Sequence, residues 1–317
     1  MNKPLSAPRY IFGPVPSRRL KRSLGVDLVP YKICTFDCIY CDLGRTTQKT
    51  ISRESYVKPE AIRKELELTL PTLSRKPDYI TLSGSGEPTL NQRIGEIIHT
   101  IKELTSIPLA VLTNGSLFSI EEVREALEGA DVVIPSLDAV RDLTFQCLNR
   151  PHPSLKLDEI ISGLIQFRKE YQSQIWLEVV FCRGLNDDRE EIEKLKGVID
   201  RIQPDRVHLN TPVRPPAEEY AYPLTTPQLE EIRKQLGNKA EIISEFAASL
   251  GEELNSVKES EIVNLIKRRP CTTEDISKAL GLRMDEVVKQ LDRLRKTGTI
   301  RYRVYQHHCY YEVPAAN

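Results

Sequence analysis

Residues 34–41 read Cys-Thr-Phe-Asp-Cys-Ile-Tyr-Cys, which places Cys34, Cys38 and Cys41 within eight residues of one another. Three thiolates on one short loop can ligate three metal positions without help from elsewhere in the chain. A structural zinc site takes four ligands, but the next cysteine, Cys147, is more than 100 residues away. Thiolates also hold iron–sulfur clusters, and three of them suit a four-iron cluster with one open iron. Three free thiols, or zinc with a distant fourth ligand, remain as alternatives.

On both sides of this loop, short apolar runs alternate with amphipathic stretches, from Gly25 to about Phe246. Such alternation predicts βα units and a parallel sheet. Periodicity leaves open whether the sheet is doubly wound or closes like a barrel. The predicted strands are Val26–Val29, Tyr79–Leu82, Leu109–Thr113, Val132–Leu137, Trp176–Phe181 and Arg206–Asn210. The predicted helices are Pro59–Thr69, Asn91–Leu104, Ser119–Leu127, Leu157–Tyr171, Asp188–Arg201 and Thr226–Leu236, with a capping box at Ser119.

A second pattern begins after Ala247–Asn255, a segment without a clear element, where we place a domain boundary. Three helices are expected, at Glu259–Lys267, Thr272–Leu280 and Arg283–Lys296. Two alternating runs, Ile300–Val304 and Cys309–Val313, then predict a hairpin. Three helices and a hairpin of this size indicate a winged helix-turn-helix over residues 257–313, a module that binds nucleic acid or protein.

The 317 residues contain 45 basic and 45 acidic side chains, but the charges are unevenly distributed. Residues 1–24 hold six basic and no acidic side chains, residues 25–256 hold 27 and 37, and residues 257–313 hold twelve and eight. This distribution excludes a wholly basic nucleic-acid binder and leaves two locally basic ends. We therefore divide the chain into a basic extension (1–24), an α/β domain (25–250) and the winged helix (257–313).

Composition also indicates where the protein works. No apolar run approaches the roughly 18 residues that would span a bilayer, and residues 1–22 lack the apolar segment of a secretory signal. We expect a cytoplasmic protein that makes no membrane contact. Disulfides are then not expected, and the scattered cysteines are interpreted as ordinary residues: Cys147, Cys182, Cys271 and Cys309.

The cysteine spacing, with Tyr40 directly before the third cysteine, resembles the signature of the radical S-adenosylmethionine (radical SAM) enzymes. Three further segments fall where that family has its own: residues 83–89 (Ser-Gly-Ser-Gly-Glu-Pro-Thr), residues 113–115 (Thr-Asn-Gly) and residues 136–139 (Ser-Leu-Asp-Ala). The first resembles the family's Gly-Gly-Glu-Pro segment, with Ser85 in place of its first glycine. The resemblance implies a partial (βα)6 barrel, a [4Fe-4S] cluster on Cys34, Cys38 and Cys41, and S-adenosylmethionine contacts from Tyr40, Ser85, Gly86, Glu87, Asn114, Ser136 and Asp138.

Residues 13–20 and 23–27 add a closer resemblance, to a branch near the wyosine-type tRNA-modifying radical enzymes. Members of that group that condense pyruvate carry a second cluster, whose ligands precede the radical one. No cysteine precedes Cys34 here, so that particular reaction is not expected.

Polar residues inside predicted strands indicate a polar cavity, because an unpaired buried charge is costly. Asp27, Glu178, His208 and Asn210 are the clearest cases, and Arg18, Arg19 and Arg214 lie near the same strand ends. Arginine clusters hold phosphorylated or nucleic-acid ligands. The candidate substrate residues are Arg18, Arg19, Glu178, Asn210 and Arg214.

Two functions follow. In the first, the chain is an enzyme: a flavodoxin or ferredoxin reduces the cluster, S-adenosylmethionine is cleaved to a 5′-deoxyadenosyl radical, and hydrogen is taken from a substrate such as an RNA base. In the second, it is a nucleic-acid-binding redox sensor that works through the winged helix. A sensor would need neither the Gly-Ser-Gly-Glu-Pro segment nor six βα units, so the enzyme is the favoured interpretation.

Overall fold

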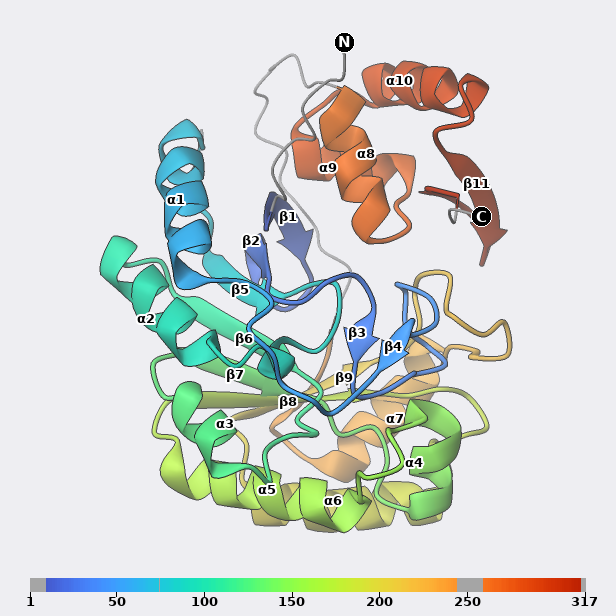
Figure 1. The fold of residues 1–317 in the computed structure, drawn as a ribbon. Helices are drawn as coiled ribbons and strands as arrows, with labels where there is room; N and C mark the ends of the chain where they lie inside the picture. Colours follow the sequence, from blue (N-terminus) through green and yellow to red (C-terminus); the bar gives the residue numbers. More distant parts are fainter. Residues whose placement is uncertain (1–9, 74, 244–258, 315–317) are drawn as a thin grey trace.

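The computed structural model describes residues 10–73, 75–243 and 259–314 (Figure 1). An eight-stranded sheet runs through the larger part of the chain, in the order β1-β2-β5-β6-β7-β8-β9-β10. All neighbours from β2 onward pair in parallel, and β1 alone is antiparallel to β2. The strands are β1 (Ile11–Ser17), β2 (Lys21–Asp27), β5 (Tyr79–Ser83), β6 (Leu109–Thr113), β7 (Val132–Pro135), β8 (Gln174–Val180), β9 (Arg206–Asn210) and β10 (Ala240–Ile242).

The strand order follows the chain order without reversal. A doubly wound sheet reverses direction at a switch point, so this sheet is not doubly wound. Helices connect its parallel strands and pack along its outer side (Figure 1). They are α1 (Pro59–Thr69), α2 (Ile94–Leu104), α3 (Glu121–Ala126), α4 (Asp142–Asn149), α5 (Leu157–Glu170), α6 (Arg189–Ile202) and α7 (Thr226–Leu236), with 3-10 turns η1 (Leu70–Thr72) and η2 (Pro88–Leu90).

Alternation along each strand separates the two faces of the sheet. In β8, Ile175, Leu177 and Val179 belong to the large core shared with the helices. Trp176 faces the other way into a small apolar cluster, and Glu178 follows it on that same face. The other strands repeat this pattern, because successive side chains point to opposite faces. The inner face is therefore apolar near the start of the strands and polar near their carboxyl ends.

The predicted helices and strands of this domain are present, with ends shifted by a few residues. Helix α6 begins as expected, because the Asp188 side chain accepts a hydrogen bond from Glu191 N (3.1 Å). The predicted capping box at Ser119 is wrong: α3 follows Ile120, and no side chain caps it. Helix α4, which carries Cys147, was not predicted.

Residues 1–24 were expected to form a basic extension outside the α/β domain. The described part of this segment belongs to the sheet instead. Residues 11–17 form β1, and β2 begins at Lys21, so both strands belong to the sheet. Pro14 and Pro16 obscured β1, since proline cannot donate to a ladder and is tolerated only at sheet edges and bulges. Here β1 is the edge strand, and its register shifts between Phe12 and Val15.

The C-terminal unit, residues 259–314, contains three helices and a hairpin. Its elements match the predicted ones: α8 (Glu259–Arg268), α9 (Thr273–Leu280), α10 (Met284–Lys296), β11 (Arg301–Tyr305) and β12 (His308–Glu312). Thr272 and Asp275 form a capping box at α9, and Gly281 ends that helix in the left-handed region (φ 66°). The predicted boundary segment, 247–255, lies outside the described residues.

The C-terminal unit packs on β1 (Figure 1). Val15 is buried among Ile262, Leu265 and other residues of its core, and Phe12 packs against the same cluster. The two short strands β3 (Ile33–Cys34) and β4 (Gln48–Lys49) form a separate parallel pair. Among the described residues, no helix combines the length and apolar character needed to cross a membrane.

Two helix glycines test how tightly the outer layer packs. A Cβ on Gly163 of α5 would lie 2.6–2.8 Å from backbone atoms of Phe118 and Ser119, whereas one on Gly197 of α6 would meet nothing within 4 Å. We expect Gly163→Ala to lower the free energy of unfolding by about 1–3 kcal/mol through overpacking. Gly197→Ala should raise it by about 0.5–1 kcal/mol through helix propensity. Denaturant unfolding measures both, and equal effects would contradict the packing described.

Candidate active site

The cysteine loop lies at the carboxyl ends of the strands and is held by backbone hydrogen bonds to two later segments. Asp37 N and Ile39 N donate to the carbonyls of Asn149 and Leu148 at the end of α4, each at 3.0 Å. Glu87 N, in the segment after β5, donates to the Ile33 carbonyl (3.1 Å). The loop is thus fixed between the ends of β5 and α4 without any cross-link.

All three thiols of the loop are half-buried and unpaired in disulfides. Each sulfur accepts a hydrogen bond from a side-chain nitrogen: Cys41 from Lys32 Nζ (3.1 Å), Cys34 from Asn114 Nδ2 (3.6 Å) and Cys38 from Asn149 Nδ2 (3.5 Å). Burial raises the pKa of Cys34 to about 12 and that of Cys38 well above its usual value. These thiols are therefore poor nucleophiles on their own, and a bound metal would be needed to deprotonate them.

This donor set fits an iron–sulfur cluster better than a single ion. No group of three or more His, Cys, Asp or Glu side chains in the described ranges is gathered tightly enough to hold one metal ion. A four-iron cluster is wider than an ion, and each cysteine binds a different iron. Nitrogen donors to the sulfurs are also a means by which proteins tune such clusters.

The segment after β5 approaches the cysteine loop closely at Gly86. A Cβ there would collide with the Ile33 carbonyl, so only glycine fits without displacement. The next residue, Glu87, is buried. Its carboxylate accepts hydrogen bonds from Thr89 N, Thr89 Oγ1, Thr113 Oγ1 and Asn114 N, at 2.6–3.0 Å. Glu87 therefore ties the ends of β5 and β6 together.

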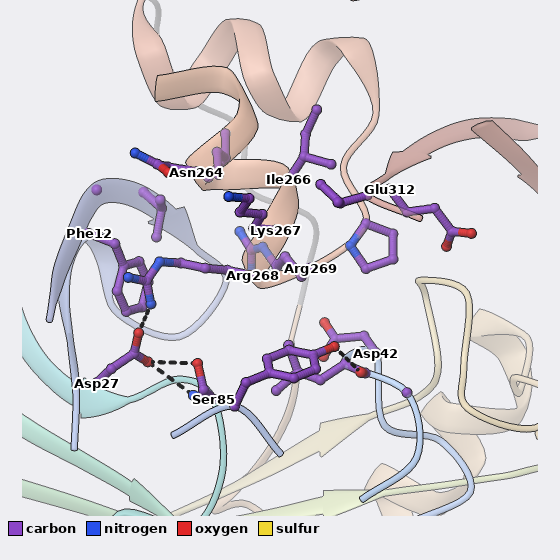
Figure 2. Close-up of a pocket in the computed structure, with 18 of the residues that line it drawn as sticks. Phe12, Asp27, Asp42, Ser85, Asn264, Ile266, Lys267, Arg268, Arg269 and Glu312 are labelled. Atoms are coloured by element: carbon purple, nitrogen blue, oxygen red, sulfur yellow. Dashed lines mark hydrogen bonds and ion pairs between the residues drawn. The ribbon is translucent and has the colours of Figure 1, made fainter. Parts of the chain in front are cut away.

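Ser85 is buried beside a charged pair that joins the two parts of the chain (Figure 2). Its backbone N and its hydroxyl donate to Asp27 Oδ1 (3.0 and 3.2 Å). The other oxygen of Asp27 forms an ion pair with Arg268, at the end of α8. The Arg268 guanidinium also lies 3.9 Å from the centre of the Phe12 ring. These residues line a cavity of about 960 Å3 between the sheet and the C-terminal unit, the interface cavity.

Tyr40 and Asp138 form a second buried network beneath the loop. The Tyr40 hydroxyl and Asn149 Nδ2 (2.8 Å) donate to Asp138 Oδ2, and Val180 N donates to Oδ1 (2.8 Å). Burial raises the pKa of Asp138 to about 6, although these three donors oppose the shift. Burial also raises the pKa of Tyr40, which keeps its hydroxyl protonated and able to donate.

A cavity of about 350 Å3 opens at the carboxyl ends of the strands, and we call it the strand-end cavity. Arg18 Nη1 donates to Asn210 Oδ1 (2.9 Å), and Asn210 Nδ2 donates to Glu178 Oε1 (2.7 Å). Arg19 forms an ion pair with Glu178 and, despite burial, holds the pKa of that carboxyl below its usual value. The structure thus brings all five candidate substrate residues to one cavity, which is lined by Arg18, Arg19, Glu178, Asn210, Arg214, Tyr40, Cys41 and Ser136, among others.

The structure also shows where the polar strand residues and the scattered cysteines lie. Of the four polar strand residues, Asp27, Glu178 and Asn210 line cavities. His208 does not: it packs against Trp176 and contacts Glu241 through Nε2 (3.0 Å). Among the scattered cysteines, Cys182 and Cys271 are buried, whereas Cys147 and Cys309 are exposed.

Three residues of the site were not identified from sequence as part of it. Lys32 and Asn149 donate to the cluster cysteines, and Arg268 reaches Asp27 from the C-terminal unit. Lys32 is buried and lies two residues before Cys34, and this short distance in sequence could have identified it as a neighbour of the cysteine loop. Nothing in the sequence pattern distinguishes Asn149 or Arg268, because tertiary packing alone brings them to the site.

Comparison with known proteins places this geometry in a family. The sequence model of the Radical SAM superfamily matches residues 28–195. The UPF0026 protein MJ1312 of Methanocaldococcus jannaschii is 39% identical over 233 residues, which cover 73% of this chain and 71% of that protein. A UPF0026 protein of Helicobacter pylori is 34% identical over 84% of this chain and 87% of its own length.

A protein of Brachyspira hyodysenteriae named GTPase Obg is 35% identical over 296 residues. The match covers 92% of this chain but 43% of that protein, so the chain spans less than half of this relative's length.

Solved structures agree in fold. A radical SAM methyltransferase from Sphaerobacter thermophilus has a TM-score of 0.53 at 18% identity, over 69% of this chain and 65% of that one. Native anSMEcpe with bound AdoMet has a TM-score of 0.50 at 17% identity, over 68% and 58%. The chain therefore belongs to the radical SAM superfamily, whose enzymes use a [4Fe-4S] cluster and S-adenosylmethionine.

Proposed function

We propose that Cys34, Cys38 and Cys41 hold the [4Fe-4S] cluster and that the strand-end cavity receives the substrate. The observation that carries this proposal is the loop itself: three half-buried thiols, each accepting an N–H hydrogen bond, beside a cavity at the carboxyl ends of the strands. When bound, the reduced cluster supplies one electron that cleaves S-adenosylmethionine to a 5′-deoxyadenosyl radical, which takes hydrogen from the substrate.

The surrounding residues would position S-adenosylmethionine. Ser85 and Gly86 stand at the close approach between the β5 end and the cysteine loop, where we place the methionine end. Ser136 lines the strand-end cavity, and Asp138 lies just beyond it under Tyr40. Asn114 and Glu87 hold these segments in register, so we assign both a positioning role.

An RNA base is one substrate that the arginine-rich cavity would accept, in line with the closer resemblance to the wyosine-type branch. Two kinds of relative carry guanine nucleotides in their names. One is the GTPase Obg above, and the other is a Probable GTP 3′,8-cyclase of Thermoplasma volcanium, 28% identical over 49% of this chain. These names describe those proteins, and they support a nucleotide-like substrate here.

The electron would come from a small carrier such as a flavodoxin or ferredoxin. Arg45 and Lys49, close to the cysteine loop in sequence, are exposed. Arg45 also forms an ion pair with Glu218 (2.9 Å), so Lys49 is the better placed of the two to meet an acidic donor, because complementary charge speeds encounter.

We further propose that the sheet and its helices form a partial (βα)6 barrel and that the C-terminal unit is a winged helix-turn-helix that covers the barrel mouth. Its hairpin contacts the segment after β9: Arg303, Gln306 and Tyr310 donate to the carbonyls of Pro216, Pro212 and Val213 (2.7–3.4 Å). On α10, Arg295 and Lys296 pair with Asp292. A hairpin engaged within the chain, and two α10 cations that already pair with an acidic neighbour, favour a covering role over the nucleic-acid-binding redox sensor.

The ligand assignment is tested by cysteine substitution. Cys34→Ser, Cys38→Ala and Cys41→Ser should each lose most iron after anaerobic reconstitution and abolish 5′-deoxyadenosine formation from S-adenosylmethionine and dithionite. Cys147→Ser and Cys309→Ser remove exposed thiols outside the loop, and they should retain both properties. Turnover by Cys38→Ala would show that the assignment is wrong.

The link between the two parts of the chain is tested at Arg268. Arg268→Ala leaves the buried carboxylate of Asp27 without its cation, and we expect it to lower the free energy of unfolding by about 2–3 kcal/mol. Lys267→Ala removes an exposed neighbour and should change it by less than about 0.5 kcal/mol.

A double-mutant cycle with Asp27→Asn isolates the pair, and we expect a coupling of about 1–3 kcal/mol from denaturant unfolding. Purely additive effects would mean that the two side chains do not interact in solution.

A further inference from the structure

Two guanidinium groups in the strand-end cavity have no carboxylate partner within the part of the chain that the structure describes. Among the carboxylates that the structure describes, none forms an ion pair with Arg18 or Arg269, and Arg18 contacts only the neutral Asn210 amide. The other cations that line the cavity are paired: Arg19 with Glu178, Arg268 with Asp27, and Arg214 with Asp275 at 3.5 Å.

The unpaired cations come from separate parts of the chain. Arg18 lies in the turn between β1 and β2, and Arg269 directly follows α8. Arg214, which follows β9, lines the same cavity, and its Nε is buried without a hydrogen-bond acceptor among the described residues. Three segments, one of them in the C-terminal unit, therefore bring cations to one small space.

The electrostatics of this arrangement are unfavourable without a ligand. Burial, with Arg19 and Arg214 nearby, lowers the pKa of Arg18 to about 10. Repulsion from Arg214, followed by burial, lowers the pKa of Arg269. Asp42 also lines the cavity but forms no ion pair with either. The carboxylates of Asp42 and Asp275 are the anions that stand near the guanidinium groups of Arg18, Arg214 and Arg269. Three cations and two anions leave an excess positive charge in a poorly hydrated site.

We propose that the strand-end cavity binds a phosphate group of the substrate, with Arg18, Arg214 and Arg269 donating to its oxygens. Guanidinium groups match the geometry of phosphate and form charge-assisted hydrogen bonds with it. A phosphate is also the stronger choice over a carboxylate, because its three terminal oxygens can accept from three guanidinium groups at once.

The proposal deepens the proposed function and rests on it, since the cavity must hold the substrate next to the cluster loop. A volume of about 350 Å3, partly enclosed by Leu265, Arg268 and Arg269, suits the phosphate end of a small molecule such as a nucleotide. Because Arg269 comes from the C-terminal unit, the barrel alone would provide an incomplete site.

The test measures phosphate binding by the full-length reconstituted protein. Isothermal titration with inorganic phosphate, pyrophosphate, GTP and a short single-stranded RNA should show binding of pyrophosphate or GTP. Arg18→Gln and Arg269→Gln should each weaken it about tenfold or more, equivalent to about 1.4 kcal/mol. Arg201→Gln, an exposed residue on α6, serves as the matched control and should leave it unchanged.

The GTP and RNA titrations distinguish a nucleotide from RNA as the source of the phosphate group. Binding of the RNA but not of GTP, lost in the same variants, would assign the phosphate to RNA. Arg269→Lys keeps the charge and should retain part of the affinity, and circular dichroism with iron content verifies folding of every variant. No binding of any phosphate probe, or binding by Arg18→Gln and Arg269→Gln as tight as that of the wild type, would overturn the proposal.

The proposed function can fail separately from this inference. Reductive cleavage of S-adenosylmethionine is measured on the wild type without any phosphate probe, so its outcome does not depend on the phosphate site. If the wild type binds pyrophosphate but yields no 5′-deoxyadenosine, the radical chemistry is wrong and the phosphate site stands. If the wild type cleaves S-adenosylmethionine but binds no phosphate probe, the radical chemistry stands and the phosphate site is wrong.

Discussion

The cysteine loop can work only if a short irregular segment is held still at the mouth of the sheet. Its backbone donates to the end of α4 and accepts from the segment after β5. Asn114, which directly follows β6, and Asn149, the last residue of α4, reach its sulfurs. Each of these contacts depends on the strands keeping their sequential parallel order, which sets their carboxyl ends side by side. Contacts within the chain thus define the shape of the loop, as a preorganised site requires.

The two ends of the sheet's inner face carry different chemistry. Apolar residues such as Trp176 close one end, while charged and amide side chains gather at the other. The C-terminal unit packs on β1 and brings Arg268 and Arg269 over the polar end (Figure 2). A covered polar cavity is the environment that radical chemistry needs, because water and stray hydrogen donors must be kept from a reactive intermediate.

Sequence predicted most of the regular elements, since long apolar periodicity survives tertiary context. The elements it missed have physical explanations. Strand β1 is interrupted by prolines and owes its place to pairing at a sheet edge, and the short α4 has a weak apolar pattern. The cysteine loop was visible because three ligands are close in sequence. The donors to its sulfurs were not, since Asn149 and Cys38 are 111 residues apart.

Glu87 shows the limit of local interpretation in a different way. The family resemblance implied a contact between Glu87 and S-adenosylmethionine, whereas the fold also engages this carboxylate in hydrogen bonds from Thr113 and Asn114. Similarly, Asp27 was correctly singled out as a polar strand residue, but its partner comes from a helix more than 200 residues later. Residue type and spacing can identify a charge that needs a partner, whereas the choice of partner belongs to the fold.

The central claim is that this loop supplies only three ligands, so that one iron remains open to S-adenosylmethionine. Mössbauer and electron paramagnetic resonance spectra of the anaerobically reconstituted full-length protein, with and without S-adenosylmethionine, test it most directly. The account predicts about four irons per chain in one cubane cluster, one iron distinct from the other three, and a spectrum of the reduced cluster that changes when S-adenosylmethionine binds. A spectrum unaffected by S-adenosylmethionine, or a site that retains zinc and no iron, would contradict it.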